Sequence, residues 1–240
     1  MKYDIIYTEA KKQFAEWANP EIVKKYSRYF REGYDAYGLV EGQLTEYSKQ
    51  VLEKYPEMTV NDILKLGDTL FADGKYEMGS LAYLLLYDKK KQFDASTIKG
   101  VKRWFDRGVS NWAHSDVLCS KITPIFFEKK ILTFQDLKDW RTSDSRWTRR
   151  AVPVTLLALR KTEAPGNLLS FIEPMILDKE RVVHQGLGWF LREVWKIHPR
   201  EVEDILFTYK NTAARLIIQY ATEKMTKEQK ARFAKDKKKA

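Results

Sequence analysis

Trp112 and Asp116 are two residues whose types and spacing would allow them to bind a cationic ligand. They stand four positions apart in a stretch predicted to be helical, so they share one face about one turn apart. The face of an indole attracts positive charge, and so does a carboxylate, so the pair suits a cationic ligand. A core tryptophan beside a solvated aspartate is the alternative interpretation, and the spacing alone leaves both open.

A second group of candidates is basic. Arg149 and Arg150 follow Trp147 closely, and Arg141 and Arg146 lie just before them. The planar guanidinium group can donate two hydrogen bonds to one phosphate, so these arginines suit a phosphate backbone. An ordinary solvated charge cluster would have the same composition.

The segment 183–193 contains two glycines in the interior of an expected helix. Gly186 and Gly188 each weaken a helix by roughly 1 kcal/mol relative to alanine, which indicates that another helix or a ligand must come close. Trp189 and Arg192 are three residues apart and therefore neighbours on the helix surface. Trp189 also aligns with core positions in a repeat of small residues at intervals of about 36, and this alignment favours burial of Trp189 in the core.

A small residue returns at nearly constant intervals, each time at the start of an apolar run. Gly79, Ser115, Ala151 and Gly186 are separated by 36, 36 and 35 residues, and a weaker copy begins near Ala214. A period of this length predicts stacked pairs of helices, in which each unit buries its apolar face against its neighbours.

The chain is therefore expected to be all-α. Pro153 should kink its helix, because proline lacks the backbone N–H. We expect a single domain over 1–225, followed by a basic and partly disordered tail over 226–240. The expected helices are 3–17, 20–32, 43–55, 60–71, 75–89, 96–107, 111–127, 134–141, 145–161, 167–177, 180–196, 200–208 and 211–223.

Charge and composition narrow the class of partner. The net charge is +10, of which residues 226–240 supply +5, so anionic partners are favoured, nucleic acid first, with solubility as the plain alternative. The single cysteine, Cys119, lies in an expected core position and excludes an intrachain disulfide. His114, His184 and His198 lack metal-ligand spacing and are expected at the surface or at helix ends. No signal peptide and no apolar run of about 20 residues is visible, so a soluble cytoplasmic protein is expected.

Three segments, in this order and spacing, resemble the AlkD-type DNA alkylation repair family of HEAT-like-repeat DNA glycosylases. The segments are 110–116, 146–151 and 186–193, and Arg28-Tyr29 with Gly38 is similar to the family's N-terminal helix segment. The resemblance implies a HEAT-like helical-repeat solenoid, a right-handed α–α superhelix with a concave basic face that grips duplex DNA. It differs at Asn111 and Ala113, where better-known members have tryptophan and aspartate, and this bears on lesion range and rate.

The same resemblance implies a reaction: hydrolysis of the N-glycosidic bond of cationic purines alkylated at N3 or N7, without deep base flipping. Asp116 would be the catalytic carboxylate, and Trp112 and Trp189 the aromatic walls at the lesion. Arg150 would bind the DNA backbone, and the further DNA-binding candidates are Arg149, Arg192 and Tyr29. Neither a metal nor another cofactor is implied, and a monomer without an obligate protein partner is expected. The rival interpretations are a non-catalytic binder of bent or branched DNA and a protein-binding scaffold.

Overall fold

The computed structural model describes residues 2–236, which form helices and contain no β-strand. They divide into two compact units, one ending at Leu132 and the other beginning at Thr133. The expected all-α class is confirmed. Of the basic tail expected over 226–240, residues 237–240 lie outside the described part.

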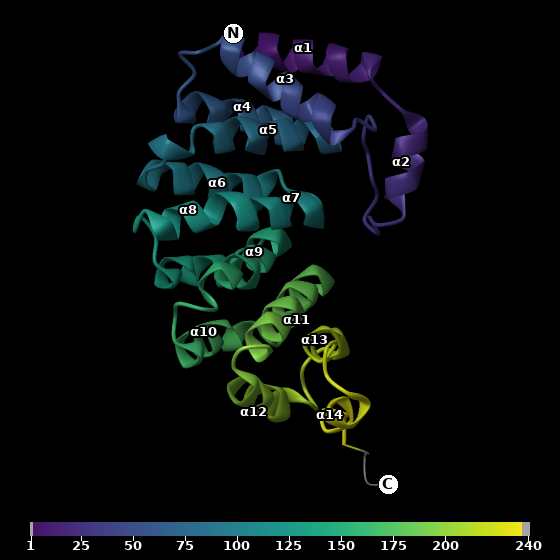
Figure 1. Cartoon of the computed structure of the whole chain (residues 1–240), viewed down its shortest axis with the longest axis vertical. Helices are drawn as coiled ribbons and strands as arrows, with labels where there is room; N and C mark the ends of the chain where they lie inside the picture. The colour runs from purple at the N-terminus through teal and green to yellow at the C-terminus, as the bar shows by residue number, and fades with distance from the viewer. Residues whose placement is uncertain (1, 237–240) are drawn as a thin grey trace. The chain divides into compact units, whose positions relative to one another are not determined.

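Over residues 2–132, the first unit is built from eight α-helices, most of them arranged in pairs. Helix α4 packs on α5 and α6, and α5 packs on α3. Figure 1 shows these helices in successive layers, from α1 and α3 to α7 and α8, with α2 beside them. The elements are α1 (Lys2–Glu16), α2 (Pro20–Ser27), α3 (Glu41–Lys54), α4 (Val60–Ala72), α5 (Tyr76–Asp88), η1 (Lys90–Gln92), α6 (Ala95–Arg107), α7 (Trp112–Val117), η2 (Leu118–Ile122) and α8 (Thr123–Glu128).

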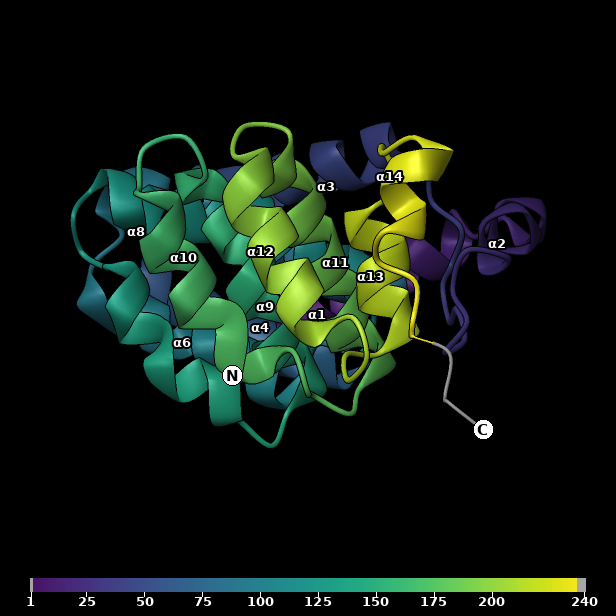
Figure 2. The ribbon, with the colours of Figure 1, turned by 90° about the horizontal axis from the view of Figure 1, so that it is seen from below.

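The second unit continues the pattern of paired helices. Helix α11 packs against α9, α12 and α13, and Figure 2 shows α10 and α12 beside each other. The elements are η3 (Phe134–Thr142), α9 (Arg146–Leu156), η4 (Leu157–Leu159), α10 (Pro165–Ile172), η5 (Glu173–Met175), α11 (Arg181–Trp195), α12 (Pro199–Tyr209), α13 (Arg215–Ala221) and α14 (Lys227–Ala231).

The repeat read from the sequence corresponds to every second main helix. Gly79, Ser115, Ala151 and Gly186 lie in α5, α7, α9 and α11, and all four are buried. Ala214 is the N-cap of α13. The interval of about 36 residues is therefore one helical pair, and the small residue marks the same helix of each pair.

Several expected boundaries were wrong for identifiable reasons. The helix expected over 20–32 ends at Ser27, and residues 28–40 lack helix because they include Gly33 and Gly38, whose φ angles are +102° and +86°. The helix expected over 134–141 is a 3-10 helix, and the one expected over 145–161 ends at Leu156, followed by a 3-10 turn. Pro153 lies inside α9, and the kink stays a prediction.

The helix expected over 111–127 is continuous but changes type. Residues Leu118–Ile122 form a π-helical turn, in which the Thr123 N–H donates to the Leu118 carbonyl oxygen. Pro124 follows directly and has no N–H to donate. The missing hydrogen bond explains why the regular α-helical ladder opens between α7 and α8.

The basic tail is partly folded within the described residues. Helix α14 is capped by Thr226, whose hydroxyl oxygen accepts from the Gln229 N–H. Phe233 is fully buried and packs on the ring of Phe207 at a centroid distance of 4.7 Å. Residues 226–236 thus continue the second unit.

Candidate functional site

Helix α7 begins at Trp112 because Asn111 caps it. Asn111 has an extended backbone, and its side-chain oxygen accepts a hydrogen bond from the His114 N–H at 2.9 Å. Asparagine is among the best residues for this position, because its oxygen satisfies a backbone N–H that the helix leaves unpaired. Trp112 therefore stands at the first position of the helix, where 36% of its surface is exposed.

The indole of Trp112 is held from the segment that follows α2. Its Nε1–H donates to the carbonyl oxygen of Tyr29 at 3.1 Å. Its ring stacks on Phe30, with a centroid distance of 5.4 Å and an interplanar angle of 25°. The structure thus brings together two candidates from the sequence, Trp112 and Tyr29, and adds Phe30, which the sequence analysis did not single out.

Asp116 lies one turn after Trp112 on the same helix and is half-buried. The expected geometry of the pair, one helix and one face, is confirmed. A half-buried carboxylate next to a partly exposed indole can contact a cation while it keeps access to water.

An aromatic groove opens beside these residues. It has a volume of about 730 Å³ and lies between α2, the segment 28–40, α3, α5 and the start of α7. Burial raises the pKa of Tyr34 well above its usual value and that of Tyr83 to about 12, so both phenols are uncharged at neutral pH. The rings that line the groove belong to Tyr26, Tyr29, Phe30, Tyr34, Tyr76, Tyr83 and Trp112.

Glu77 closes this groove and is almost completely buried, with 2% of its surface exposed. Its two carboxylate oxygens accept hydrogen bonds from the backbone N–H groups of Tyr37, Gly38 and Leu39, at 2.7–3.1 Å. A buried carboxylate needs such donors to replace its hydration. Glu77 therefore fastens the segment 28–40 to the first turn of α5.

His114 lies in the first turn of α7, as the expected position near a helix end required, but it is a core residue and the expected surface position is wrong. Only 3% of it is exposed, and its ring stacks on Tyr76 at 4.8 Å. Nε2 lies 2.8 Å from the Tyr76 carbonyl oxygen, and Nδ1 lies 3.0 Å from the Asn111 amide nitrogen. The carbonyl can only accept and the amide N–H only donate, so the imidazole proton belongs on Nε2. Burial lowers the pKa of His114 to about 4, although the hydrogen bond to Tyr76 opposes this.

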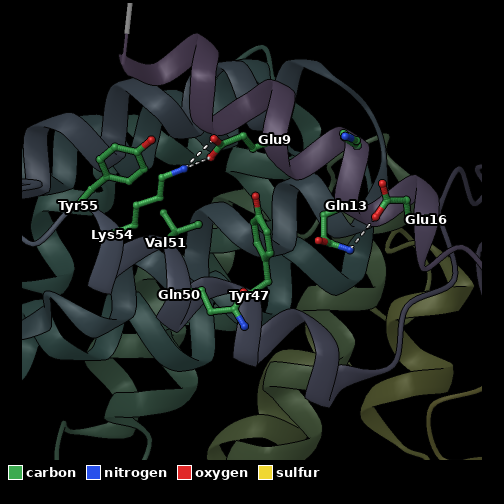
Figure 3. A pocket seen from close by; sticks show the side chains of 9 residues that line it. Glu9, Gln13, Glu16, Tyr47, Gln50, Val51, Lys54 and Tyr55 are labelled. Atoms are coloured by element: carbon green, nitrogen blue, oxygen red, sulfur yellow. Dashed lines mark hydrogen bonds and ion pairs between the residues drawn. The ribbon is translucent and has the colours of Figure 1, made fainter.

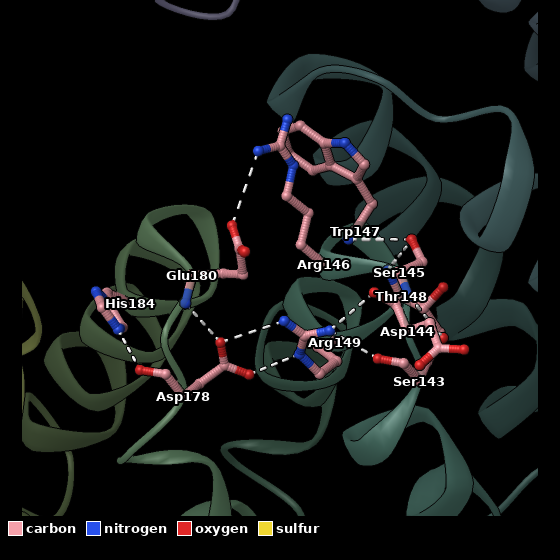
Figure 4. A network of polar contacts seen from close by, with 10 residues as sticks. All are labelled: Ser143, Asp144, Ser145, Arg146, Trp147, Thr148, Arg149, Asp178, Glu180 and His184. Atoms are coloured by element: carbon pink, nitrogen blue, oxygen red, sulfur yellow. Dashed lines mark hydrogen bonds and ion pairs between the residues drawn. The ribbon is translucent and has the colours of Figure 1, made fainter.

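In the second unit, Arg149 stands at the centre of a polar network (Figure 4). Its Nε donates to Asp178 at 2.6 Å, and its Nη1 donates to the carbonyl oxygens of Ser143 and Asp144. Asp178 in turn accepts from the Glu180 N–H at 2.8 Å. The network joins the start of α9 to the turn before α11, and the expected contact of Arg149 to DNA stays a prediction.

Arg150 is buried, with 5% of its surface exposed. Its Nη1 donates to the Val182 carbonyl oxygen at 2.7 Å, at the beginning of α11. The sequence predicts Arg150 at the DNA backbone, and in the structure its side chain also connects α9 with α11. A phosphate contact by Arg150 stays a prediction.

Trp189 and Arg192 lie on α11 and are both half-buried. Arg192 forms an ion pair with Glu223. It forms a second one with Glu193, in which Nε of the arginine lies 3.0 Å from a carboxylate oxygen. The two glycines of this helix face different neighbours: Gly186 lies against Arg150, and Gly188 lies against Tyr220 and the backbone of Ile217 on α13. The close approach that these glycines predicted is therefore confirmed, and protein groups make it.

A separate pocket of about 330 Å³ lies between α1 and α3 (Figure 3). Two pairs of its polar side chains contact each other, since Lys54 Nζ lies 2.7 Å from Glu9 and the Gln13 amide donates to Glu16. No residue that the sequence analysis singled out lines it, so it provides no chemistry for the candidate site.

Within residues 2–236 no three His, Cys, Asp or Glu side chains gather as metal ligands would, and no helix there could span a membrane.

A family model described as DNA alkylation repair enzyme matches residues 10–225. The chain belongs to this family. The match includes the segments 110–116, 146–151 and 186–193 that carried the resemblance in the sequence, so a role in DNA repair with DNA as the partner follows for the chain. No curated protein sequence matches it.

Solved structures of other proteins of this kind have the same fold. One is described as a predicted DNA alkylation repair enzyme from Enterococcus faecalis: the TM-score is 0.72 at 17% identity, over 88% of this chain and 97% of that one. AlkD2 from Streptococcus mutans gives a TM-score of 0.58 at 19% identity, over 85% of this chain and 97% of that one. A structure of smu.31 from Streptococcus mutans UA159 gives a TM-score of 0.58 at 19% identity, over 76% of this chain and 93% of that one. These structures establish the helical-repeat fold.

Proposed function

We propose that this member of the family is a monofunctional DNA glycosylase that removes purines alkylated at N3 or N7 from duplex DNA. The observation that carries the proposal is the arrangement on α7. Trp112 is held by the segment 28–40 and remains 36% exposed, and Asp116 follows one turn later on the same face. Because Trp112 is held in place, the two side chains can bind a cation at a fixed position on α7.

The chemistry follows from the charge of the substrate. A purine alkylated at N3 or N7 carries a positive charge, so it leaves as a neutral base when the N-glycosidic bond breaks and needs no strong acid. Positive charge develops on the deoxyribose, where the Asp116 carboxylate stabilises it. A water oxygen then forms the new bond to the sugar carbon and loses a proton. The indole of Trp112 contributes a second attraction for the cation.

Binding of the duplex is proposed to depend on basic side chains, in keeping with the net charge of +10. We also propose that Trp189 contacts the damaged nucleotide. The groove beside Trp112 is lined mainly by aromatic rings, and its polar lining residues are Lys25, Glu41, Glu77 and Ser80. Recognition is expected to follow the positive charge of the lesion, since the indole of Trp112 and the carboxylate of Asp116 both attract a cation.

The test is base release from a duplex that carries 7-methylguanine. The wild type is expected to release the free base, and Asp116→Asn to slow release at least a hundredfold with duplex affinity retained. Asp106→Asn is the matched control, since Asp106 lies on α6 in an ion pair with Lys102 and should release base at the wild-type rate. Tight binding without release by the wild type, across several alkyl lesions, would instead identify a non-catalytic binder of distorted DNA.

A further inference from the structure

The segment 28–40 has no regular helix, yet it is held firmly at several points. Besides the three hydrogen bonds to Glu77, the Tyr76 N–H donates to the Asp35 carbonyl oxygen at 2.7 Å, and the Asn19 N–H donates to the Tyr37 carbonyl oxygen at 2.9 Å. Gly38 is required there: its φ is +86°, and a Cβ would lie 2.2 Å from the Asn19 oxygen. The backbone of this segment is therefore fixed against α2 and α5.

Phe30 connects this fixed segment to Trp112 through contacts between aromatic rings. It stacks on Tyr34 at 4.4 Å with an interplanar angle of 23°, and it meets Tyr76 edge to face at 5.8 Å. On its other side it stacks on the indole of Trp112. Tyr76 is itself fixed by the stacked ring of His114. The indole is thus the exposed end of a packed series of rings that reaches into the core of the first unit.

We propose that Phe30 is a positioning residue, which sets the orientation of the Trp112 indole and so of the aromatic surface that meets the damaged nucleotide. The inference rests on the proposed function for its catalytic consequence. Aromatic stacking contributes about 1 kcal/mol beyond the area buried, and the hydrogen bond to Tyr29 fixes only one atom of the indole. Without Phe30 the ring can rotate about that bond, so the reacting geometry is reached less often.

The experiment compares Phe30→Leu with the wild type by two measurements. The first is single-turnover release of 7-methylguanine together with duplex affinity. The second is the indole N–H resonance of Trp112 in the free protein, assigned through Trp112→Phe. We expect release to slow about tenfold, affinity to change less than twofold, and the resonance to shift or broaden. Phe30→Tyr, which keeps the ring, should restore both, and Phe30→Met provides a second ringless variant if Phe30→Leu does not fold.

Phe93→Leu is the matched control. Phe93 stacks on Phe126 at 5.3 Å and 26° in the same unit, away from α7's first turn, so its loss should leave the Trp112 resonance and the release rate as they are. An unmoved Trp112 resonance in both ringless variants would overturn the inference. If the wild type releases no base, the proposed reaction fails, and the resonance alone still decides whether Phe30 orients the indole.

Discussion

Arg150 lies against the bare backbone of Gly186: a Cβ at position 186 would be 3.3 Å from Arg150 Cγ and 3.4 Å from its carbonyl oxygen. The aliphatic part of the arginine therefore packs where α11 approaches α9, while its Nη1 reaches the Val182 carbonyl. One side chain thus contributes packing and a hydrogen bond at the same junction, which makes its replacement informative in two ways.

Arg150→Ala is expected to lower the free energy of unfolding by about 2–4 kcal/mol, because it leaves a cavity beside Gly186 and removes the hydrogen bond to the Val182 carbonyl oxygen. If the remaining guanidinium nitrogens contact a phosphate, the slope of log affinity against log salt should fall in magnitude by about 1. The measurements are urea unfolding and duplex binding at several salt concentrations. Lys161→Ala controls for the loss of an exposed charge, and a slope equal to the control's would remove Arg150 from the phosphate contacts.

Arg149 is expected to act mainly within the fold. Its side chain is 16% exposed and that of Asp178 is 8% exposed, so Arg149→Met should destabilise the protein by about 3 kcal/mol, since a nearly buried carboxylate loses its partner. If Arg149 also contacts a phosphate, as the sequence predicts, the slope of log affinity against log salt should fall in magnitude by about 1. An unchanged slope would show that the guanidinium acts only within the fold, where it engages Asp178.

Arg146→Met is the matched control for Arg149. Arg146 lies in the same helix, is 44% exposed and stands 3.7 Å from Glu180, so its loss should lower stability by less than about 1 kcal/mol. Equal stability losses in the two variants would contradict a structural role specific to Arg149.

Gly188→Ala is expected to destabilise the protein by about 1–3 kcal/mol. A Cβ would lie 2.4 Å from Tyr220 Cβ and 2.9 Å from the Ile217 oxygen, so α11 and α13 would have to separate. Gly166→Ala in α10 meets no atom within 4 Å and should be neutral or stabilising by up to about 1 kcal/mol. Thermal unfolding of both variants tests this, and a gain in stability at position 188 would show that the helices can separate easily.

His114 is expected to make stability depend on pH below its usual pKa of 6.5. Because its folded pKa is about 4, the unfolded chain takes up a proton first as the pH falls, and stability is lost between about pH 6.5 and 4. The loss is on the order of 3 kcal/mol. His114→Gln keeps a donor for the Tyr76 carbonyl oxygen but has no group that titrates in this range. Between pH 7.5 and 4.5 its free energy of unfolding, measured in urea, should therefore fall by about 3 kcal/mol less than that of the wild type. Parallel losses in the two proteins would refute this assignment.

The helical pairs could be predicted from the sequence because their signals are local. The small residues at intervals of about 36 are in α5, α7, α9 and α11, and Pro20 with Asn19 marked the start of α2 as expected. The π-helical turn was missed, although Pro124 is its local cause, because a proline near a helix end more often begins a new helix than opens an existing one.

Within the candidate site, the sequence predicted only the relation between residues of the same helix. Trp112 and Asp116 share a face of α7, as their spacing required. The contact of Trp112 with Tyr29 spans 83 residues, and the partners of Arg149 and Arg192 stand 29 and 31 residues away. Contacts over such separations have no periodic signal. His114 was misjudged for the same reason, because its partners Tyr76 and Ser80 belong to the preceding repeat.

The small residue of a repeat is matched by a large polar residue of a neighbouring repeat. Gly79 leaves room for the imidazole of His114, since a Cβ there would lie 2.5 Å from Cε1, and Gly186 leaves room for Arg150. Each pair restricts the order in which mutations can be accepted during evolution. A side chain becomes tolerable at position 79 only after position 114 has become smaller and the ring of Phe71, whose Cε1 would lie 2.9 Å from the new Cβ, has moved or shrunk. Positions 79 and 114 should therefore change together among descendants of this sequence.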